Sequence, residues 1–203
     1  MPRLLFVSNE GNDLVQVQGD RFLRNWRRTS QPSTRYPRYE EHVRPRFVED
    51  YHTFQSFLAD NKLDSAFSPN QCEITYVSDI RACDAWASHS EIYKVFRFFD
   101  QSYFDREPEP TETLGVQLVR LIKDSAGSFL GRLHIDVKAL VQLDDGTEKQ
   151  NPLFRLTMTA RGRPTEAGEQ GVLGFLDLGR ANIVKAFDRM STQSMHTTWG
   201  KSQ

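Results

Sequence analysis

Cysteine is scarce in this sequence, and long apolar runs are absent. Two cysteines, Cys72 and Cys83, occur among 203 residues. They make neither a disulfide framework nor a zinc cluster, so both are expected to be free thiols in a reducing compartment. No stretch approaches the roughly 18 apolar residues of a membrane-spanning helix. The apolar run at residues 4–7 is too short for a signal peptide, and the cytoplasm is the location expected by elimination.

The sequence also lacks a surplus of either charge. Its 26 Lys and Arg residues nearly balance 27 Asp and Glu residues, for a net charge of −1. The whole chain is therefore neither a polycation made for nucleic acid nor an acidic disordered tail. The basic residues are 19 Arg against 7 Lys, which suits planar recognition of carboxylate or phosphate. A GC-rich genome produces the same bias, and we favour that interpretation.

Recognisable catalytic and metal-binding motifs are missing as well. The sequence has no serine elbow, glycine-rich phosphate loop, paired-cysteine motif or His-Glu-His metal motif. His134 and Asp136 lie two residues apart on the wet face of an expected strand, and two ligands are too few for a metal site. We interpret them as an exposed polar pair. No catalytic residue, metal ligand or cofactor is assigned, which favours a protein that is not an enzyme.

The first part of the chain predicts three strands and one helix. Residues 4–8, 13–18 and 22–27 have strand character and are separated by the turn signals at 9–12 and 19–20, with a helix as the weaker alternative for the third segment. A Pro- and Ser-containing loop follows at 29–38. From about Tyr39 to Asp60 an apolar stripe at helical spacing predicts a helix, with Pro45 in its first turn.

The second part predicts four strands and further helices. We expect a strand at 71–80, a short helix near 90–99, an exposed acidic loop at 100–112, and strands at 114–123, 133–143 and 152–160. Six apolar residues alternate through the middle strand of the last three, at positions 133, 135, 137, 139, 141 and 143, and predict one buried face. A hairpin turn is expected at 144–146. A closing helix spans about 172–190, or begins near Asp177 because of Gly174 and Gly179, and a last turn or helix follows from 191.

These elements predict an α+β fold. We expect a mainly antiparallel sheet of about six or seven strands, with two main amphipathic helices packed on one face. Residues 1–203 are expected to form a single domain. The order of a strand meander followed by a helix recurs in 1–70 and 71–203, which suggests a pseudo-repeat.

An arginine-rich region with interleaved aromatics is the first candidate binding surface. Residues 21–46 contain eight arginines and only two acids, a composition that can bind phosphates and stack bases. A structural role, with core aromatics and solvated arginines, is the interpretation we favour. The candidate surface for a protein partner or nucleic acid consists of Arg21, Arg24, Trp26, Arg27, Arg28, Arg35, Tyr36 and Arg38.

The C-terminal segment supplies the second candidate contact. His196 and Trp199 fall in the last expected turn. They are either a contact site or a Trp plug over the core with His as its polar edge, and the plug is favoured.

Segments along nearly the whole chain carry a resemblance. They are 14–18, 20–22, 25–27, 36–40, 54–58, 72–77, 175–180, 187–188, 192, 195–196 and 199–200. They resemble an uncharacterised, sporadically distributed family of bacterial proteins, and the Asn25-Trp26-Arg27 and Tyr36-Pro37-Arg38-Tyr39 motifs are the most specific.

Two features depart from that family. Its members usually have a further N-terminal segment that supplies an extra strand, so either the sheet has an open edge that risks association, or the gene start is shorter here. They often have His at the position of Arg180. The resemblance implies no established activity.

Three functions remain open at this point. The leading hypothesis is a non-enzymatic binding or regulatory module that acts through a protein partner or self-association, including as a homodimer. The sporadic distribution of the similar proteins suggests a bacterial stress or defence locus, by analogy alone. The alternatives are a nucleic-acid-binding protein that uses the 21–46 region, and a ligand-binding protein or enzyme with a pocket between helix and sheet.

Overall fold

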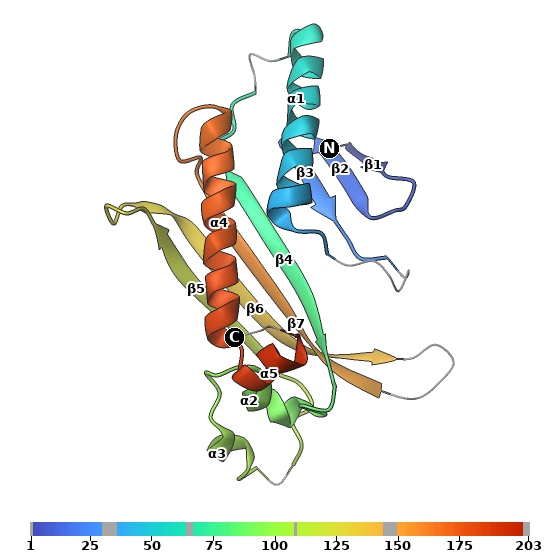
Figure 1. The fold of residues 1–203 in the computed structure, drawn as a ribbon, viewed down its shortest axis with the longest axis vertical. Helices are drawn as coiled ribbons and strands as arrows, with labels where there is room; N and C mark the ends of the chain where they lie inside the picture. Colours follow the sequence, from blue (N-terminus) through green and yellow to red (C-terminus); the bar gives the residue numbers. More distant parts are fainter. Residues whose placement is uncertain (1, 30–35, 64–66, 108, 144–149, 201–203) are drawn as a thin grey trace. The chain divides into compact units, whose positions relative to one another are not determined.

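The computed structural model describes residues 2–29, 36–63, 67–107, 109–143 and 150–200. Its contacts divide the chain into two compact units, Met1–Ser68 and Pro69–Gln203. Each unit combines helices with antiparallel strands (Figure 1), so the predicted α+β class is confirmed. The seven strands of the described residues form two sheets rather than the single sheet expected. The expectation that residues 1–203 form a single domain stays a prediction.

The first unit is a three-stranded meander followed by a helix. Its elements are β1 (Arg3–Val7), β2 (Asp13–Gln18), β3 (Arg21–Trp26), the π-helical turn η1 (Tyr39–Val43) and α1 (Arg44–Asp60). The strands pair in the order β1-β2-β3, with every pair antiparallel. The three predicted strands and the predicted helix are confirmed, with Pro45 in the first turn of α1. The helical alternative for the third segment is wrong.

Aromatic packing joins α1 to the sheet of the first unit. The Phe22 ring of β3 stacks on Phe54 of α1, with centroids 5.0 Å apart, and also contacts Phe47 and Tyr51. The Tyr51 and Phe54 rings in turn contact Phe67. Since aromatic rings that pack together remove much apolar area from water, this cluster is the main apolar contact between helix and sheet.

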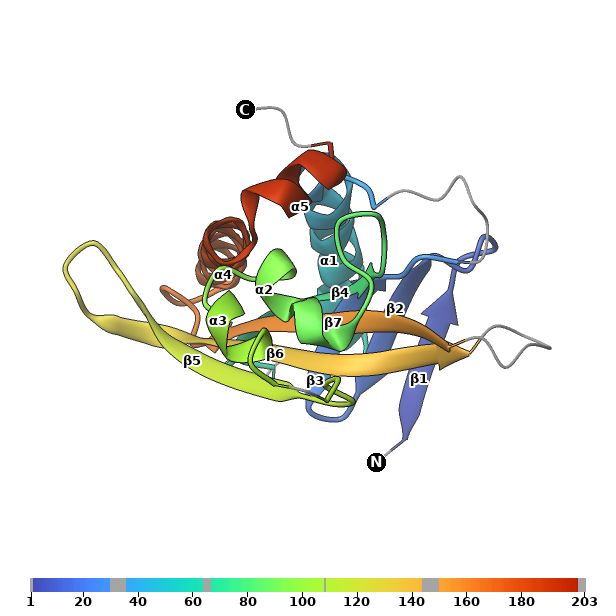
Figure 2. The same ribbon diagram turned by 90° about the horizontal axis from the view of Figure 1, so that it is seen from below.

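The second unit is a four-stranded antiparallel sheet covered by one long helix. The strands are β4 (Cys72–Arg81), β5 (Gly115–Lys123), β6 (Phe129–Leu143) and β7 (Gln150–Gly162), in the order β4-β7-β6-β5. The helix α4 (Glu169–Met190) lies across one face of this sheet (Figures 1 and 2). All four predicted strands are confirmed, and the turn predicted at 144–146 lies outside the described residues. Both units place a helix after three consecutive strands, and a pseudo-repeat stays a prediction.

The alternation in β6 predicts its buried face only in part. Leu133, Ile135, Val137 and Ala139 are buried, as expected. Val141 and Leu143 are 46% and 64% exposed, so their predicted burial is wrong. They lie at the end of β6 paired with Pro152 and Gln150 at the start of β7. A period-two pattern fixes which face a side chain lies on, but not how far the covering helix reaches.

Glycines let α4 approach the sheet closely, and the helix begins before Asp177. A Cβ atom at Gly179 would lie 2.8 Å from Ile74 Cγ2 in β4 and 3.0 Å from Ala160 Cβ in β7. At Gly171 it would lie 1.8 Å from the Glu166 carbonyl oxygen. The lower helix propensity of glycine had suggested a later start, but the packing that these glycines permit offsets it. The closing helix is confirmed, and the start near Asp177 is wrong.

The helix predicted at 90–99 is shorter than expected. This part contains a 3₁₀ turn, η3 (His89–Glu91), then α2 (Ile92–Val95), and a separate α3 (Gln101–Phe104). Helix α2 ends because Phe96 adopts extended backbone angles and forms a β-bridge with Ser191. The last helix, α5 (Gln193–Thr198), is confirmed, and its cap Thr192 accepts a hydrogen bond from the Met195 amide.

Both cysteines are free, as predicted. Cys72 is buried at the start of β4, and burial raises the pKa of its thiol to about 11. Among the described residues, no helix combines the length and apolar character needed to cross a membrane.

Candidate functional site

The candidate metal or acid/base pair of the sequence, His134 and Asp136, lies on β6. Within the described parts of the chain, no group of three or more His, Cys, Asp or Glu side chains could hold a metal ion. Asp136 accepts a hydrogen bond from Gln117 at 2.8 Å and lies 3.8 Å from Lys138. His134 lies on the same face of β6 opposite Val119 and Thr159. Both side chains are half-buried, so the pair is polar as expected but is not fully exposed.

The interface between α4 and its sheet leaves no room for a ligand where Gly179 crosses. Even a single Cβ atom at Gly179 would crowd Ile74 and Ala160, so the helix and the sheet pack closely there. A depression elsewhere in the second unit is lined mainly by polar residues and is open to solvent, at Pro69, Asn70, Gln71, Arg163, Pro164 and Glu166. It lacks the concave apolar lining of a small-molecule site.

The side chain of Arg24, in the arginine-rich region, is buried. It is 6% exposed and contacts Asp13 of β2 at 2.6 Å and Asp50 of α1. His42 Nε2 lies 3.5 Å from the same Asp13 oxygen. Because both carboxylates point at this guanidinium, Arg24 joins the sheet to the helix and is not exposed to a phosphate.

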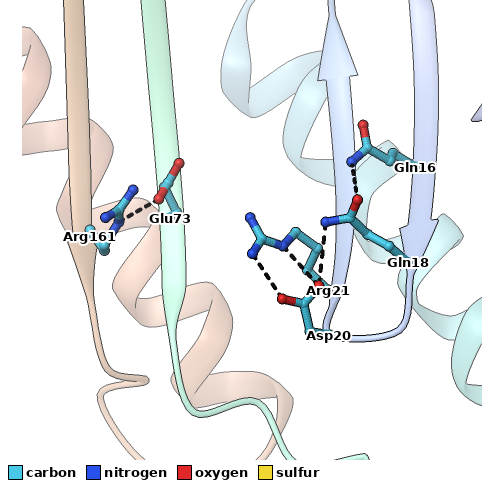
Figure 3. Close-up of polar contacts among 6 residues, drawn as sticks. All are labelled: Gln16, Gln18, Asp20, Arg21, Glu73 and Arg161. Atoms are coloured by element: carbon cyan, nitrogen blue, oxygen red, sulfur yellow. Dashed lines mark hydrogen bonds and ion pairs between the residues drawn. The ribbon is translucent and has the colours of Figure 1, made fainter. Parts of the chain in front are cut away.

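Three further arginines of this region also have intramolecular contacts. Arg21 donates to Asp20 through Nε and one terminal nitrogen (Figure 3), which lowers the pKa of that carboxyl. Arg27 Nε donates to the Gly11 carbonyl at 2.8 Å, and Arg38 pairs with Glu41 at 3.0 Å. Such pairing lowers the basic potential that phosphate binding needs.

The remaining candidates of this region divide by exposure. Trp26 is half-buried, and its ring meets Tyr36 edge-on at 5.2 Å, while Tyr36 itself is 46% exposed. Arg28 is exposed, and Arg35 lies outside the described residues. The two aromatic rings are therefore adjacent, and most of the described arginines of this region already have intramolecular partners.

His196 and Trp199 differ in exposure. His196 is buried, with Nε2 3.7 Å from an Asp188 oxygen. Trp199 is 39% exposed and stacks on Phe187 with ring centroids 5.2 Å apart. Only the Trp199 ring can therefore take part directly in a surface contact.

A surface that sequence reasoning did not single out is the best candidate site. Residues 93–104 of the second unit contain a connected set of aromatic rings, here called the aromatic surface: Tyr93, Phe98, Phe99, Tyr103 and Phe104. Phe98 and Tyr103 are 43% and 61% exposed, and the other three are half-buried. A signal for this surface existed in the sequence, because residues 93–104 contain six of the chain's aromatic residues.

The rings form a continuous path from the core to solvent. Phe154 of β7 and Phe96 are fully buried and meet at 6.0 Å. Phe96 meets Phe98 at 5.8 Å, and Phe98 meets Phe99 at 4.7 Å. Phe104 then contacts Phe99, Tyr93 and Tyr103. Since each ring packs on another, the exposed rings are held in place before any partner arrives.

Hydrogen bonds fix both ends of the aromatic surface. Arg97 donates from Nε to the Ser191 carbonyl at 2.5 Å and from its amide to the Met190 carbonyl at 2.8 Å. Asp100 caps α3 by accepting from the Ser102 amide at 2.8 Å. The Thr111 amide donates to Ser90 Oγ at 2.7 Å.

His89 holds the segment that follows the aromatic surface. The ring nitrogens of this buried residue lie 3.2 Å from the Glu112 carbonyl oxygen and 3.1 Å from the Leu140 carbonyl oxygen. The segment is therefore tied to β6.

Exposed acidic residues lie within and directly after the segment that contains the aromatic surface, and they are here called the acidic rim. Asp100, Asp105, Glu107, Glu109 and Glu112 are all exposed, and residues 97–112 contain only two arginines beside them. The predicted acidic stretch is exposed, but residues 101–104 form α3, so the expectation of a loop throughout 100–112 is wrong for that part. Lys94 does not offset the rim, because it pairs with Glu91. That pairing, together with the Ala87 amide, lowers the pKa of Glu91.

The open face of the second sheet is charged but internally neutralised. Arg161 donates to Glu73 at 2.6 Å (Figure 3), and Arg155 pairs with Asp79 at 2.7 Å. The hydrogen bond from Arg155 lowers the pKa of Asp79. In each of these cross-strand pairs the arginine neutralises the opposite carboxylate, so the face has no unpaired cluster of like charge at these positions.

Comparison with known proteins identifies no relative. No protein-family model matches the chain, and no curated protein or solved structure is significantly similar to it. The bacterial family resemblance stays a prediction, and the function is argued from the site.

Proposed function

We propose that this protein is a non-enzymatic binding module that holds a protein partner on the aromatic surface. The observation that carries the proposal is the set of five linked rings, two of them substantially exposed, in one twelve-residue segment. Exposed Phe and Tyr side chains that are fixed by packing are typical of the residues that contribute most to binding energy at protein interfaces. We place the module in the cytoplasm, where both thiols stay reduced.

The acidic rim specifies the kind of partner. The five exposed carboxylates of the acidic rim attract a segment in which apolar side chains are flanked by lysine or arginine. The same carboxylates repel phosphates, so this surface suits a protein and not a nucleic acid. The apolar anchors would cover Phe98 and Tyr103, while the basic residues would meet the rim.

Two matched peptides test the proposed binding of a basic, apolar segment. One labelled peptide has Leu and Phe anchors flanked by lysines, and the other has glutamates in place of the lysines. Fluorescence anisotropy should show binding of the lysine peptide only, and that binding should weaken at high salt as screening grows. Equal binding of both peptides, or of neither, rejects the proposal.

Variants locate the binding surface. Phe98→Ala with Tyr103→Ala should reduce affinity by about tenfold or more, because hot-spot truncations cost at least about 2 kcal/mol. Asp105→Lys with Glu107→Lys should reverse the preference between the peptides. Arg21→Ala with Arg28→Ala is the matched control, since it changes exposed residues of the first unit, and it should leave binding unchanged.

A further inference from the structure

The edge strand of the first unit is apolar on both faces and exposed along its whole length. Leu4, Leu5, Phe6 and Val7 are 58%, 49%, 59% and 48% exposed. Within the described residues, β1 pairs only with β2, so its outer edge presents unpaired backbone groups. An edge with these properties is a template for pairing with another strand.

Helix α1 leaves β1 uncovered. The register Leu4–Val17–Phe22 places Leu4 on the face whose Phe22 ring packs on the helix, and Phe6 lies on that face too. Yet both side chains are more than half exposed, because the helix packs over β3. Leu4 and Phe6 therefore form an exposed apolar strip on the helix-facing side of the sheet, next to α1.

Devices that normally block an edge are missing from the middle of β1. The strand contains no Lys, Glu, Asp or Pro, and its single charge, Arg3, is at its first position. Natural sheets usually place a charge, a proline or a bulge there to prevent association. The centre of β1 is thus suited to a strand of matching apolar character.

We infer that two copies of this chain pair antiparallel through β1, with Leu5 opposite Leu5 of the second copy on the two-fold axis. In this register Leu4 lies opposite Phe6 of the second copy, and Arg3 lies opposite Val7. Apolar residues meet on both faces, and the two arginines lie at opposite ends. A parallel pairing would set the two arginines side by side, and like charges directly opposite destabilise a sheet.

This pairing gives a symmetric six-stranded sheet and a weak dimer. Four half-exposed side chains on each strand cover an area at the low end of specific interfaces. The expected dissociation constant is therefore micromolar, about 1–100 µM. The pairing uses residues of the first unit only and is independent of the aromatic surface.

Sedimentation equilibrium over a concentration series tests the dimer. The wild-type chain should shift from monomer to dimer across the micromolar range. Leu5→Lys should remain monomeric, because it places two lysines opposite each other, while the neutral Leu5→Thr should weaken the dimer less. Circular dichroism should show both variants folded, since Leu5 is half exposed. A wild-type chain that stays monomeric at several hundred µM, well above the expected constant, overturns the inference.

Disulfide trapping tests the register. In a Cys83→Ser background, Leu5→Cys should form a dimer on mild oxidation, because residues on the axis lie within the range of a disulfide, with Cα atoms about 4.5–5.5 Å apart. Leu4→Cys alone should not, because the two residues 4 lie about 8 Å apart. A mixture of Leu4→Cys and Phe6→Cys chains should form the mixed disulfide. Trapping by Leu4→Cys alone, or failure of Leu5→Cys, overturns the assigned register.

Discussion

Replacing Arg24 with alanine should destabilise the first unit markedly, although the side chain belongs to a region of apparently surplus arginines. The guanidinium is 6% exposed and contacts two carboxylates from different elements, Asp13 and Asp50. Removing one partner of a buried ion pair costs about 3–5 kcal/mol, because the remaining charges are left without a counter-charge. Asp13 and Asp50 are 19% and 32% exposed, so water solvates them in part. We therefore expect a loss of about 2–3 kcal/mol.

Urea unfolding monitored by circular dichroism measures this loss, and hydrogen exchange locates it. Exchange should accelerate in β3 and α1 and stay unchanged in β4–β7. Arg21→Ala is the matched control, because Arg21 and Asp20 are both about half exposed, and it should cause no measurable change. Adding Asp13→Asn and Asp50→Asn to Arg24→Met should recover part of the stability, because no unpaired charge then remains. A loss below about 0.5 kcal/mol for Arg24→Ala, which is the range of an ordinary surface substitution, refutes the reasoning.

Three further predictions concern the thiol, the helix glycine and the arginine-rich region. Burial raises the pKa of the Cys72 thiol to about 11 from 9.0. The contribution of this protonated thiol to the free energy of unfolding should therefore be complete below about pH 9 and decline between about pH 9 and 11. In the native protein at pH 8, Cys72 should resist alkylation by iodoacetamide until urea is added. Gly179→Ala should lower the midpoint of thermal unfolding, because crowding of Ile74 and Ala160 costs about 1–3 kcal/mol while the gain in helix propensity is about 1 kcal/mol; a raised midpoint would contradict the close packing. A gel-shift assay at low salt should show no binding of single- or double-stranded nucleic acid by residues 21–46, and a salt-sensitive shift would restore that hypothesis.

The sequence was sufficient where a structure follows from local periodicity. Alternation in β6 and the helical stripe of α1 depend on the geometry of one element and its neighbours, so their types and most of their bounds could be predicted. The end of α2 could not be predicted, because Phe96 leaves the helix to pair with Ser191, far along the chain. The role of Arg24 depended in the same way on Asp50, which only the packing of α1 on the sheet brings near.

The candidate site was predictable in composition and not in arrangement. The acidic stretch and the aromatic residues around it are visible in the sequence, but the short helix expected near 90–99 does not indicate which of these rings reach solvent. Only the ring contacts and exposures distinguish Phe96, which is in the core, from Phe98 and Tyr103, which reach solvent. The uncovered β1 edge likewise depends on how far α1 extends across its sheet, which no local pattern encodes.

Nuclear magnetic resonance of the ¹⁵N-labelled chain, titrated with the lysine peptide, tests the central claim most directly. A partner that rests on the aromatic surface should shift amide resonances across residues 93–107 and leave those of residues 21–28 unchanged. Shifts centred on residues 21–28, or no shifts at saturating peptide, would contradict it.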